Sequence, residues 1–226
     1  MKYENMTIGK FISRPNRFIA NVEVDGKIEV CHVKNTGRCK ELLIPNATVY
    51  IQRNDNPNRK TKFSLIGVLK GNKKINIDSQ VTNKVVNEWI SEGMLFKDVT
   101  LVKPECKYKN SRFDFYVETK SKKIFIEVKG ATLEENGIVR FPDAPTERGV
   151  KHIHELVECI NEGYEAYIIF VIQMKEVLYF TPNDLTHKAF GDALREAERK
   201  GVHILAIDSE VTEDSIELRE YVEVKL

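Results

Sequence analysis

The sequence predicts a chain of two parts, a small closed β-barrel followed by an α/β domain. Up to about Asp78, short apolar segments alternate with turn residues, which is the pattern of an all-β unit. After Asp78-Ser79 the apolar period changes from 2 to 3.6, and apolar strands then alternate with amphipathic helices. The 226 residues are 42% hydrophobic and 31% charged, which is enough for one compact domain and one small one. We therefore expect the barrel at 1–79 and the α/β domain at 80–226.

Two hairpins define the expected barrel. One turn is Asp25-Gly26, a two-residue pair whose positive φ angles match the twist of a hairpin, and the other expected turn is Gly71-Asn72. Closure of the sheet would remove the exposed edges that an open sheet of this size leaves. The expected strands are, in order, 18–24, 27–33, 47–52, 63–70 and 73–77.

The α/β part begins with a helix that ends before Gly93. Segment 166–172 is almost continuously apolar, as a central strand covered on both faces should be. Segment 184–200, capped by Gly201, is helical, so strand 202–207 should complete a right-handed parallel crossover. Segment 217–226 alternates charged and apolar residues and is expected to be an edge strand or a partly ordered end. The remaining expected elements are strands at 100–102, 112–118 and 123–129 and a helix at 148–161.

A hairpin centred between Lys120 and Ser121 would group three ionisable side chains. In that register, the residue numbers of two directly opposed residues add up to 241, so Asp114 lies opposite Glu127. Lys129, two residues further along, points to the same face. The opposite face would then be apolar, made of Phe113, Phe115, Val117, Ile124, Ile126 and Val128.

Two opposed carboxylates repel each other unless they bind a cation, and Mg²⁺ is usually held by one or two carboxylates together with water and phosphate oxygens. Such a site suits phosphodiester hydrolysis, with Lys129 orienting the water and offsetting charge. Glu88 could add a metal ligand from the first helix, and Gln173, at the end of the central strand, could hold the water or the metal shell. The alternative is a solvated hairpin face on which Glu127 pairs with a lysine.

Basic loops in both parts could contact phosphate. In the barrel these are Lys34, Asn35, Arg38 and Lys40, with Gly37 permitting close backbone approach, and a second cluster of Arg59, Lys60 and Lys62. In the α/β domain, Thr146 can cap the helix that carries Arg148 and Lys151. Solvated loops are the alternative for each. His152, His154 and Glu155 lack the spacing of a zinc motif, so we expect them on the helix surface.

Composition excludes several classes of protein. With 35 basic and 34 acidic side chains, no global field draws the chain to a polyanion or a membrane. No segment approaches the roughly 18 apolar residues of a membrane span, and residues 1–10 lack the apolar core and basic end of a signal peptide, so we expect a cytoplasmic protein. The four cysteines are scattered, which favours reduced structural thiols with no disulfide partner.

The sequence resembles the sugar fermentation stimulation protein A family over essentially its whole length. The motifs that carry the resemblance are Asn35-Thr-Gly-Arg38, Arg112-Phe-Asp-Phe115, Glu127-Val-Lys-Gly130 and Phe141-Pro-Asp-Ala-Pro-Thr-x-Arg-Gly149. The resemblance implies an OB-like barrel joined to a mixed sheet flanked by helices of the PD-(D/E)XK nuclease type. It maps the nuclease motif onto Asp114, Glu127 and Lys129, with Phe113 in place of the motif's proline.

Two functional hypotheses follow. The first is a DNA-binding protein with a phosphodiester-hydrolysing site that uses Mg²⁺ or Mn²⁺. The second, which the family also implies, is a non-catalytic DNA-binding regulator of sugar-utilisation genes, because a nuclease-like scaffold can bind DNA without cutting it. DNA is favoured as partner, but RNA stays open because OB-like barrels accept single strands of either kind.

Overall fold

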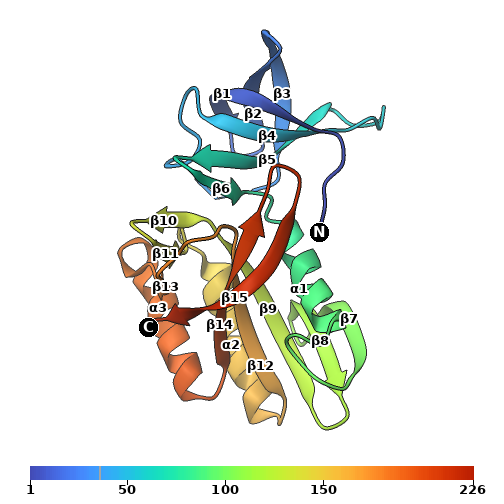
Figure 1. Cartoon of the computed structure of the whole chain (residues 1–226). Helices are drawn as coiled ribbons and strands as arrows, with labels where there is room; N and C mark the ends of the chain where they lie inside the picture. The colour runs from blue at the N-terminus through green and yellow to red at the C-terminus, as the bar shows by residue number, and fades with distance from the viewer. Residues whose placement is uncertain (36) are drawn as a thin grey trace.

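The computed structural model describes residues 1–35 and 37–226, and it consists of two domains, the barrel above and the larger α/β domain below in Figure 1. Among these residues, no helix is long and apolar enough to cross a membrane. The chain has fifteen strands and three helices in the described part.

The first domain is a closed barrel. Its strands are β1 (Met6–Asn16), β2 (Ile19–Val24), β3 (Lys27–Val33), β4 (Thr48–Arg53), β5 (Phe63–Lys70) and β6 (Lys73–Asn76). They run in the order β3-β2-β1-β4-β5-β6, and a parallel pairing of β3 with β5 closes the sheet into five strands. Both predicted hairpins are present, with positive φ at Asp25, Gly26 and Gly71. The barrel was expected without β1, which supplies the strand between β2 and β4.

The second domain is a nine-stranded mixed sheet in the order β10-β11-β13-β15-β14-β12-β9-β8-β7. Its strands are β7 (Val99–Tyr108), β8 (Ser111–Thr119), β9 (Lys123–Ala131), β10 (Leu133–Glu135), β11 (Ile138–Phe141), β12 (Glu165–Ile172), β13 (Tyr179–Pro182), β14 (His203–Val211) and β15 (Ile216–Val224). The predicted central strand is β12, which pairs in parallel with both β9 and β14. The predicted edge strand is β15, and that prediction was wrong. It lies inside the sheet between β13 and β14, where one of its faces remains exposed.

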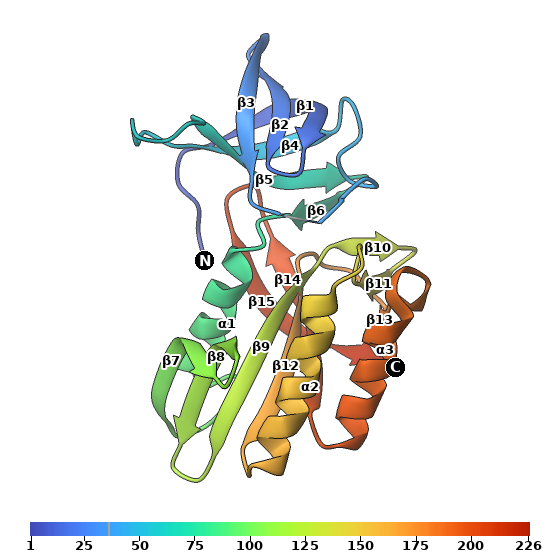
Figure 2. The ribbon, with the colours of Figure 1, turned by 180° about the vertical axis from the view of Figure 1, so that it is seen from behind.

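Helices cover both faces of this sheet. Helix α1 (Val81–Ser91) packs on one face, and α2 (Glu147–Asn161) and α3 (Asp184–Arg199) lie side by side on the other, which faces the viewer in Figure 2. The sequence pattern explains α1, because Val81, Val85, Trp89 and Ile90 recur at helical spacing and are all buried.

The first residues of the chain pack on the second domain rather than on the barrel, unlike the predicted division at residue 79. The Tyr3 N–H donates to the Asp214 oxygen over 2.7 Å, and Lys2 forms a bridge with Ser215. The Tyr3 ring is buried among the apolar side chains around α1. The chain therefore passes between the domains twice, once after Tyr3 and once near Asp78.

A buried polar network joins the domains at the second passage. Gln173 Nε2 donates to Asn76 Oδ1 over 3.0 Å and to the Asp78 oxygen over 3.1 Å. The Tyr3 hydroxyl accepts from Asn76 Nδ2, and Lys34 Nζ lies 3.1 Å from Asp78 Oδ2. Because these groups are largely buried and bonded to each other, they fix how the barrel sits on the α/β domain.

Candidate nucleic-acid cleft and metal site

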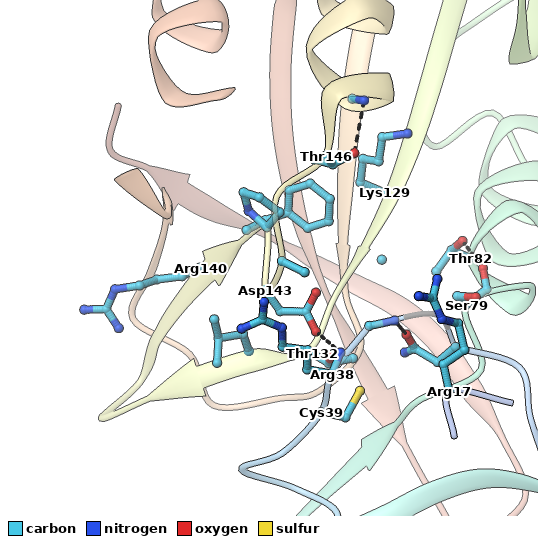
Figure 3. Close-up of a pocket in the computed structure, with 18 of the residues that line it drawn as sticks. Arg17, Arg38, Cys39, Ser79, Thr82, Lys129, Thr132, Arg140, Asp143 and Thr146 are labelled. Carbon is cyan, nitrogen blue, oxygen red and sulfur yellow. Dashed lines mark hydrogen bonds between the residues drawn. The ribbon is translucent and has the colours of Figure 1, made fainter. Parts of the chain in front are cut away.

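A cleft of about 970 Å³ lies between the two domains. Its walls come from both, and Figure 3 shows Arg17 and Arg38 of the barrel on one side with Lys129 and Thr146 of the α/β domain on the other. Basic side chains outnumber carboxylates among its described lining residues. The basic ones are Arg14, Arg17, Arg38, Lys40, Lys129, Arg140 and Arg148, and the acidic ones are Asp114, Glu127 and Asp143. The net positive lining suits a polyanion, although the whole chain is close to neutral.

The hairpin of β8 and β9 brings Asp114, Glu127 and Lys129 to this cleft. The observed register pairs Phe115 with Ile126 and Val117 with Ile124, so pairs sum to 241 as predicted. The ladder ends there, because Asp114 Oδ2 accepts the Val128 N–H over 2.7 Å. This bond holds the Asp114 carboxylate against β9.

The apolar face of the hairpin differs from the prediction at one residue. Phe115, Val117, Ile124, Ile126 and Val128 share the face covered by α1. Phe113 does not join them, because its ring packs with Tyr108, Phe125 and His152 on the α2 side. The strand changes face at Asp114, next to the point where its carboxylate replaces the ladder bond.

Glu127 is 3% exposed, yet its surroundings are polar. Its Oε1 contacts Lys129 Nζ and lies 2.6 Å from His152 Nδ1. Burial acts to raise the pKa of Glu127, but the hydrogen bond from His152 and the charge of Lys129 outweigh it, so the pKa is lowered. Glu127 is therefore held as a carboxylate.

Asp114 has the opposite tendency. Burial raises the pKa of its carboxyl, and the nearby Glu127 charge adds to the rise. The Val128 N–H and Asn83 Nδ2, which lies 2.7 Å from Asp114 Oδ1, offset part of it. Two neighbouring carboxylates form an unfavourable pair unless a cation is shared between them.

The two carboxylates fit a hard divalent cation. Glu127 Oε2 is buried and makes no hydrogen bond among the described residues, which leaves an oxygen free to coordinate. No group of three or more His, Cys, Asp and Glu side chains in residues 1–35 and 37–226 is arranged to hold a metal. Two carboxylates are the usual protein contribution to Mg²⁺, whose other positions are taken by water and phosphate.

His152 was missed by sequence reasoning, which expected His152 and Glu155 on the helix surface. Both are buried, and only His154 of the three is exposed. Arg148 Nε lies 3.4 Å from His152 Nε2, so that nitrogen accepts and Nδ1 carries the proton that is donated to Glu127. Because α2 packs over β9, the side chain of a helix residue reaches the carboxylate beneath it.

Two other predicted site residues lie elsewhere. Glu88 does not reach the cleft, because its Oε2 accepts from the Met1 amine over 3.0 Å on another part of α1. Asn83 holds the position on α1 that faces Asp114. Gln173 does not line the cleft either, since it is 1% exposed and takes part in the network between the domains.

The predicted phosphate-binding residues divide into two groups. Asn35, Arg38, Lys40, Thr146 and Arg148 line the cleft. Lys34 does not, because its ammonium is paired with buried Asp78, and Lys151 lines a neighbouring groove. The second basic cluster, Arg59, Lys60 and Lys62, lies outside the cleft lining.

The barrel loop that carries Arg38 is held in place from both sides. Arg14 donates to the backbone oxygens of Asn35, Gly37 and Arg38, with distances between 2.6 and 2.9 Å. From the other domain, Asp143 Oδ2 accepts the Arg38 N–H over 2.7 Å (Figure 3). A Cβ at Gly37 would lie 2.6 Å from that oxygen, so the close approach that glycine permits is to Asp143. Thr36 of the same motif lies outside the described residues.

Arg14, Arg17 and Arg140 were not anticipated, because only the folded barrel and the β11 region bring them to the cleft. Among the described residues, Arg17, Arg38 and Lys40 have no acidic partner within ion-pair distance, which leaves their charges available to a ligand. Thr146 does what its sequence position predicts, since its Oγ1 accepts the Gly149 N–H over 3.1 Å at the start of α2.

Comparisons with known proteins agree with this description. The family model described as the SfsA N-terminal OB domain matches residues 12–77, and that described as the sugar fermentation stimulation protein RE domain matches residues 80–215. Sugar fermentation stimulation protein homologs of Clostridium beijerinckii and Ruminiclostridium cellulolyticum are 74% and 66% identical over 226 residues, covering 100% of this chain and of each relative. The structure of Pyrococcus furiosus SfsA in complex with Ca²⁺ has a TM-score of 0.92 and 29% identity, covering 100% of this chain and 98% of that one.

Proposed function

Because the chain belongs to the sugar fermentation stimulation protein family, we propose that it binds DNA in the interdomain cleft and hydrolyses phosphodiesters there with Mg²⁺ held by Asp114 and Glu127. The observation that carries this proposal is the free, buried Oε2 of Glu127 beside the Asp114 carboxylate. The relative from Pyrococcus furiosus was solved with Ca²⁺, which takes oxygen ligands as Mg²⁺ does.

The residues around the carboxylates have distinct tasks in this proposal. Mg²⁺ held by Asp114 and Glu127 would supply charge that polarises the phosphate and lowers the pKa of an attacking water. Lys129, whose ammonium contacts Glu127 at the cleft wall, orients that water and offsets charge that develops on the phosphate. His152 fixes the Glu127 carboxylate, and Asn83 fixes that of Asp114.

The cationic side chains of the cleft position the polymer. Arg17, Arg38 and Lys40 from the barrel face Arg148 and the start of α2 across the cleft. Phosphate contacts of this kind give affinity that does not depend on sequence. The DNA backbone thus lies along the barrel loops and passes over the two carboxylates.

The direct test is incubation of the purified protein with single- and double-stranded DNA and RNA, with Mg²⁺ or Mn²⁺ and with EDTA. We expect metal-dependent cleavage that Asp114→Asn abolishes. Glu198→Gln is the matched control, because that carboxylate is exposed on α3 and does not line the cleft. Cleavage that persists in EDTA, or equally in Asp114→Asn, would exclude this site as its source.

A second candidate, a DNA-binding regulator without catalysis, is favoured by the seven basic side chains of the cleft, which bind a polyanion without any metal. It predicts binding in EDTA that survives Glu127→Gln and weakens in Arg38→Gln, with a smaller salt dependence. Unchanged affinity in Arg38→Gln would remove the assigned role of the barrel loop. RNA in place of DNA is measured in the same assays.

A further inference from the structure

A second groove, of about 400 Å³, lies beside the interdomain cleft on the outer side of His152. Four cationic residues line it, Lys107, Arg112, Arg148 and Lys151, and no carboxylate is among its described lining residues. Like charges gathered on one surface repel each other. Such a surface is stabilised when an anion binds.

The groove is a fixed part of the fold. Lys107 pairs with Arg112 across the β7–β8 hairpin. The turn of that hairpin is tied to α2, since Lys109 Nζ lies 2.9 Å from Glu158 Oε2 and 2.7 Å from Glu162 Oε1. Lys151 Nζ donates to the Asn110 oxygen over 3.4 Å. These contacts hold the cationic residues of the strand and of the helix on opposite walls.

The groove continues from the carboxylate site. Arg148 lines both the cleft and the groove, and His152, which lines the groove, contacts Glu127 at the floor of the cleft. Arg112 precedes Asp114 by two residues on β8, a rise of roughly 7 Å along a strand. A polymer that leaves the cleft past Asp114 and Glu127 therefore meets the groove next.

Two of the cations that line the groove have carboxylate partners with which a phosphate would compete. Arg112 lies 3.5 Å from Glu105, and both side chains are more than 60% exposed. Lys151 lies 3.8 Å from Glu155, whose side chain is 10% exposed, and it is the longer of the two pairs. The exposed Arg112–Glu105 pair contributes little, so a phosphate can displace it.

We propose that this groove is a second backbone-binding subsite for nucleic acid, on the side of the carboxylates opposite the barrel. The inference rests on the proposed function of the cleft. With basic surfaces on both sides of Asp114 and Glu127, the bound strand extends in both directions from the phosphate at the site. The substrate is therefore an internal phosphodiester of a continuous strand, and cleavage needs no free end.

Binding to oligonucleotides of two lengths tests the groove. The short one has about 4 nucleotides, the lower end of site sizes for one OB fold, and the long one about 16. In the wild type, the long oligonucleotide should bind more tightly than the short one. We expect the double variant Lys107→Gln/Arg112→Gln to lose most of this difference in affinity, while its affinity for the short oligonucleotide is unchanged. The slope of log affinity against log salt for the long strand should fall by about 1.4, because each of the two contacts contributes about 0.7 for single strands.

Arg199→Gln with Lys200→Gln is the matched control, since it removes one arginine and one lysine that are exposed at the end of α3 and line neither surface. This control should keep the full gain with length. If the groove variant also keeps it, the groove is not a subsite.

A covalently closed single-stranded DNA circle tests the internal mode of cleavage with Mn²⁺. We expect the circle to be opened by the wild type and not by Asp114→Asn. Intact circles beside shortened linear strands would overturn the proposal. Failure of the proposed function looks different, because the wild type would then bind neither oligonucleotide, or its cleavage of linear DNA would be unaffected by Asp114→Asn.

Discussion

The two oxygens of the Glu127 carboxylate have different surroundings, and the site depends on this asymmetry. Oε1 contacts both His152 and Lys129, whereas Oε2 has no hydrogen-bond partner among the described residues. Both oxygens of Asp114 accept hydrogen bonds, Oδ1 from Asn83 and Oδ2 from the Val128 N–H. Each carboxylate is thus fixed in orientation, which suits the metal site proposed above.

Replacing His152 should destabilise the protein, because the buried Glu127 carboxylate would then lack the hydrogen bond from His152. For His152→Ala we expect the free energy of unfolding at neutral pH to fall by about 1–3 kcal/mol, because the buried Glu127 carboxylate loses a hydrogen bond. Urea denaturation measures this change. His154→Ala, an exposed position on the same helix, should change stability by less than about 0.5 kcal/mol. His152→Asn should recover part of the loss, because its amide nitrogen can donate to Glu127, and equal losses for all three would contradict the assignment.

The cysteines offer an independent test at single residues. Burial raises the pKa of the Cys31, Cys39 and Cys159 thiols to about 12, so their thiolate fraction stays very small up to pH 9. Cys106 is the partly exposed one. We expect iodoacetamide to modify Cys106 first in the native protein, as measured by mass spectrometry, and the other three only after unfolding. Early modification of Cys39 would show that the cleft wall around it opens.

At the scale of single elements, the β8–β9 hairpin and helix α2 together form the site. The hairpin register was predictable, because its turn and its alternation of apolar residues fix which positions pair. The role of His152 was not predictable, since nothing in the helix sequence tells which sheet residue lies beneath it. Glu88 was assigned to the site because it lies on α1, yet Asn83 is the residue on the side that meets Asp114. A sequence shows where a residue lies along a helix. It does not show how the helix is rotated about its own axis relative to the sheet that it packs on.

The start of α2 should be sensitive to its cap. Thr146→Ala removes the acceptor for the Gly149 N–H, and we expect a loss of about 1 kcal/mol in unfolding free energy. Because the same helix turn presents Arg148 to the cleft, oligonucleotide affinity should also fall. Thr146→Ser keeps the hydroxyl and should restore both stability, measured by denaturation, and binding. If serine and alanine behave alike, the cap is not what positions Arg148.

On the scale of the whole molecule, the cleft exists only because two domains are held in one arrangement. The closed barrel and the α/β class of the second domain were both predictable from the alternation of strands, turns and helices, and the mixed sheet was implied by the family resemblance. Their relative placement was not, because it depends on buried polar groups that are far apart in the chain, such as Asn76 and Gln173. The cationic residues that were missed, Arg14, Arg17 and Arg140, reach the cleft through that placement.

Tyr3 is expected to couple the two domains. Tyr3→Ala removes a ring buried in the core around α1, and loss of a core aromatic side chain costs about 3–5 kcal/mol. Trp89, the only tryptophan, belongs to the same cluster and reports on it by fluorescence during urea unfolding. Glu4→Ala, an exposed neighbour, should leave the midpoint unchanged. A Tyr3→Ala midpoint equal to that of the wild type would mean that the first passage between the domains contributes nothing.

The pairing of Tyr3 with Asp214 also sets the order in which the protein can assemble on the ribosome. Domains generally fold as they emerge, so the barrel strands can close while later residues are still being translated. Tyr3 leaves the exit tunnel with them, but its binding partners next to β15 are synthesised more than two hundred residues later. Until then the first residues lack the contacts with Asp214 and Ser215, and the interval between barrel closure and docking of this segment is a stage at which the nascent chain is exposed to aggregation.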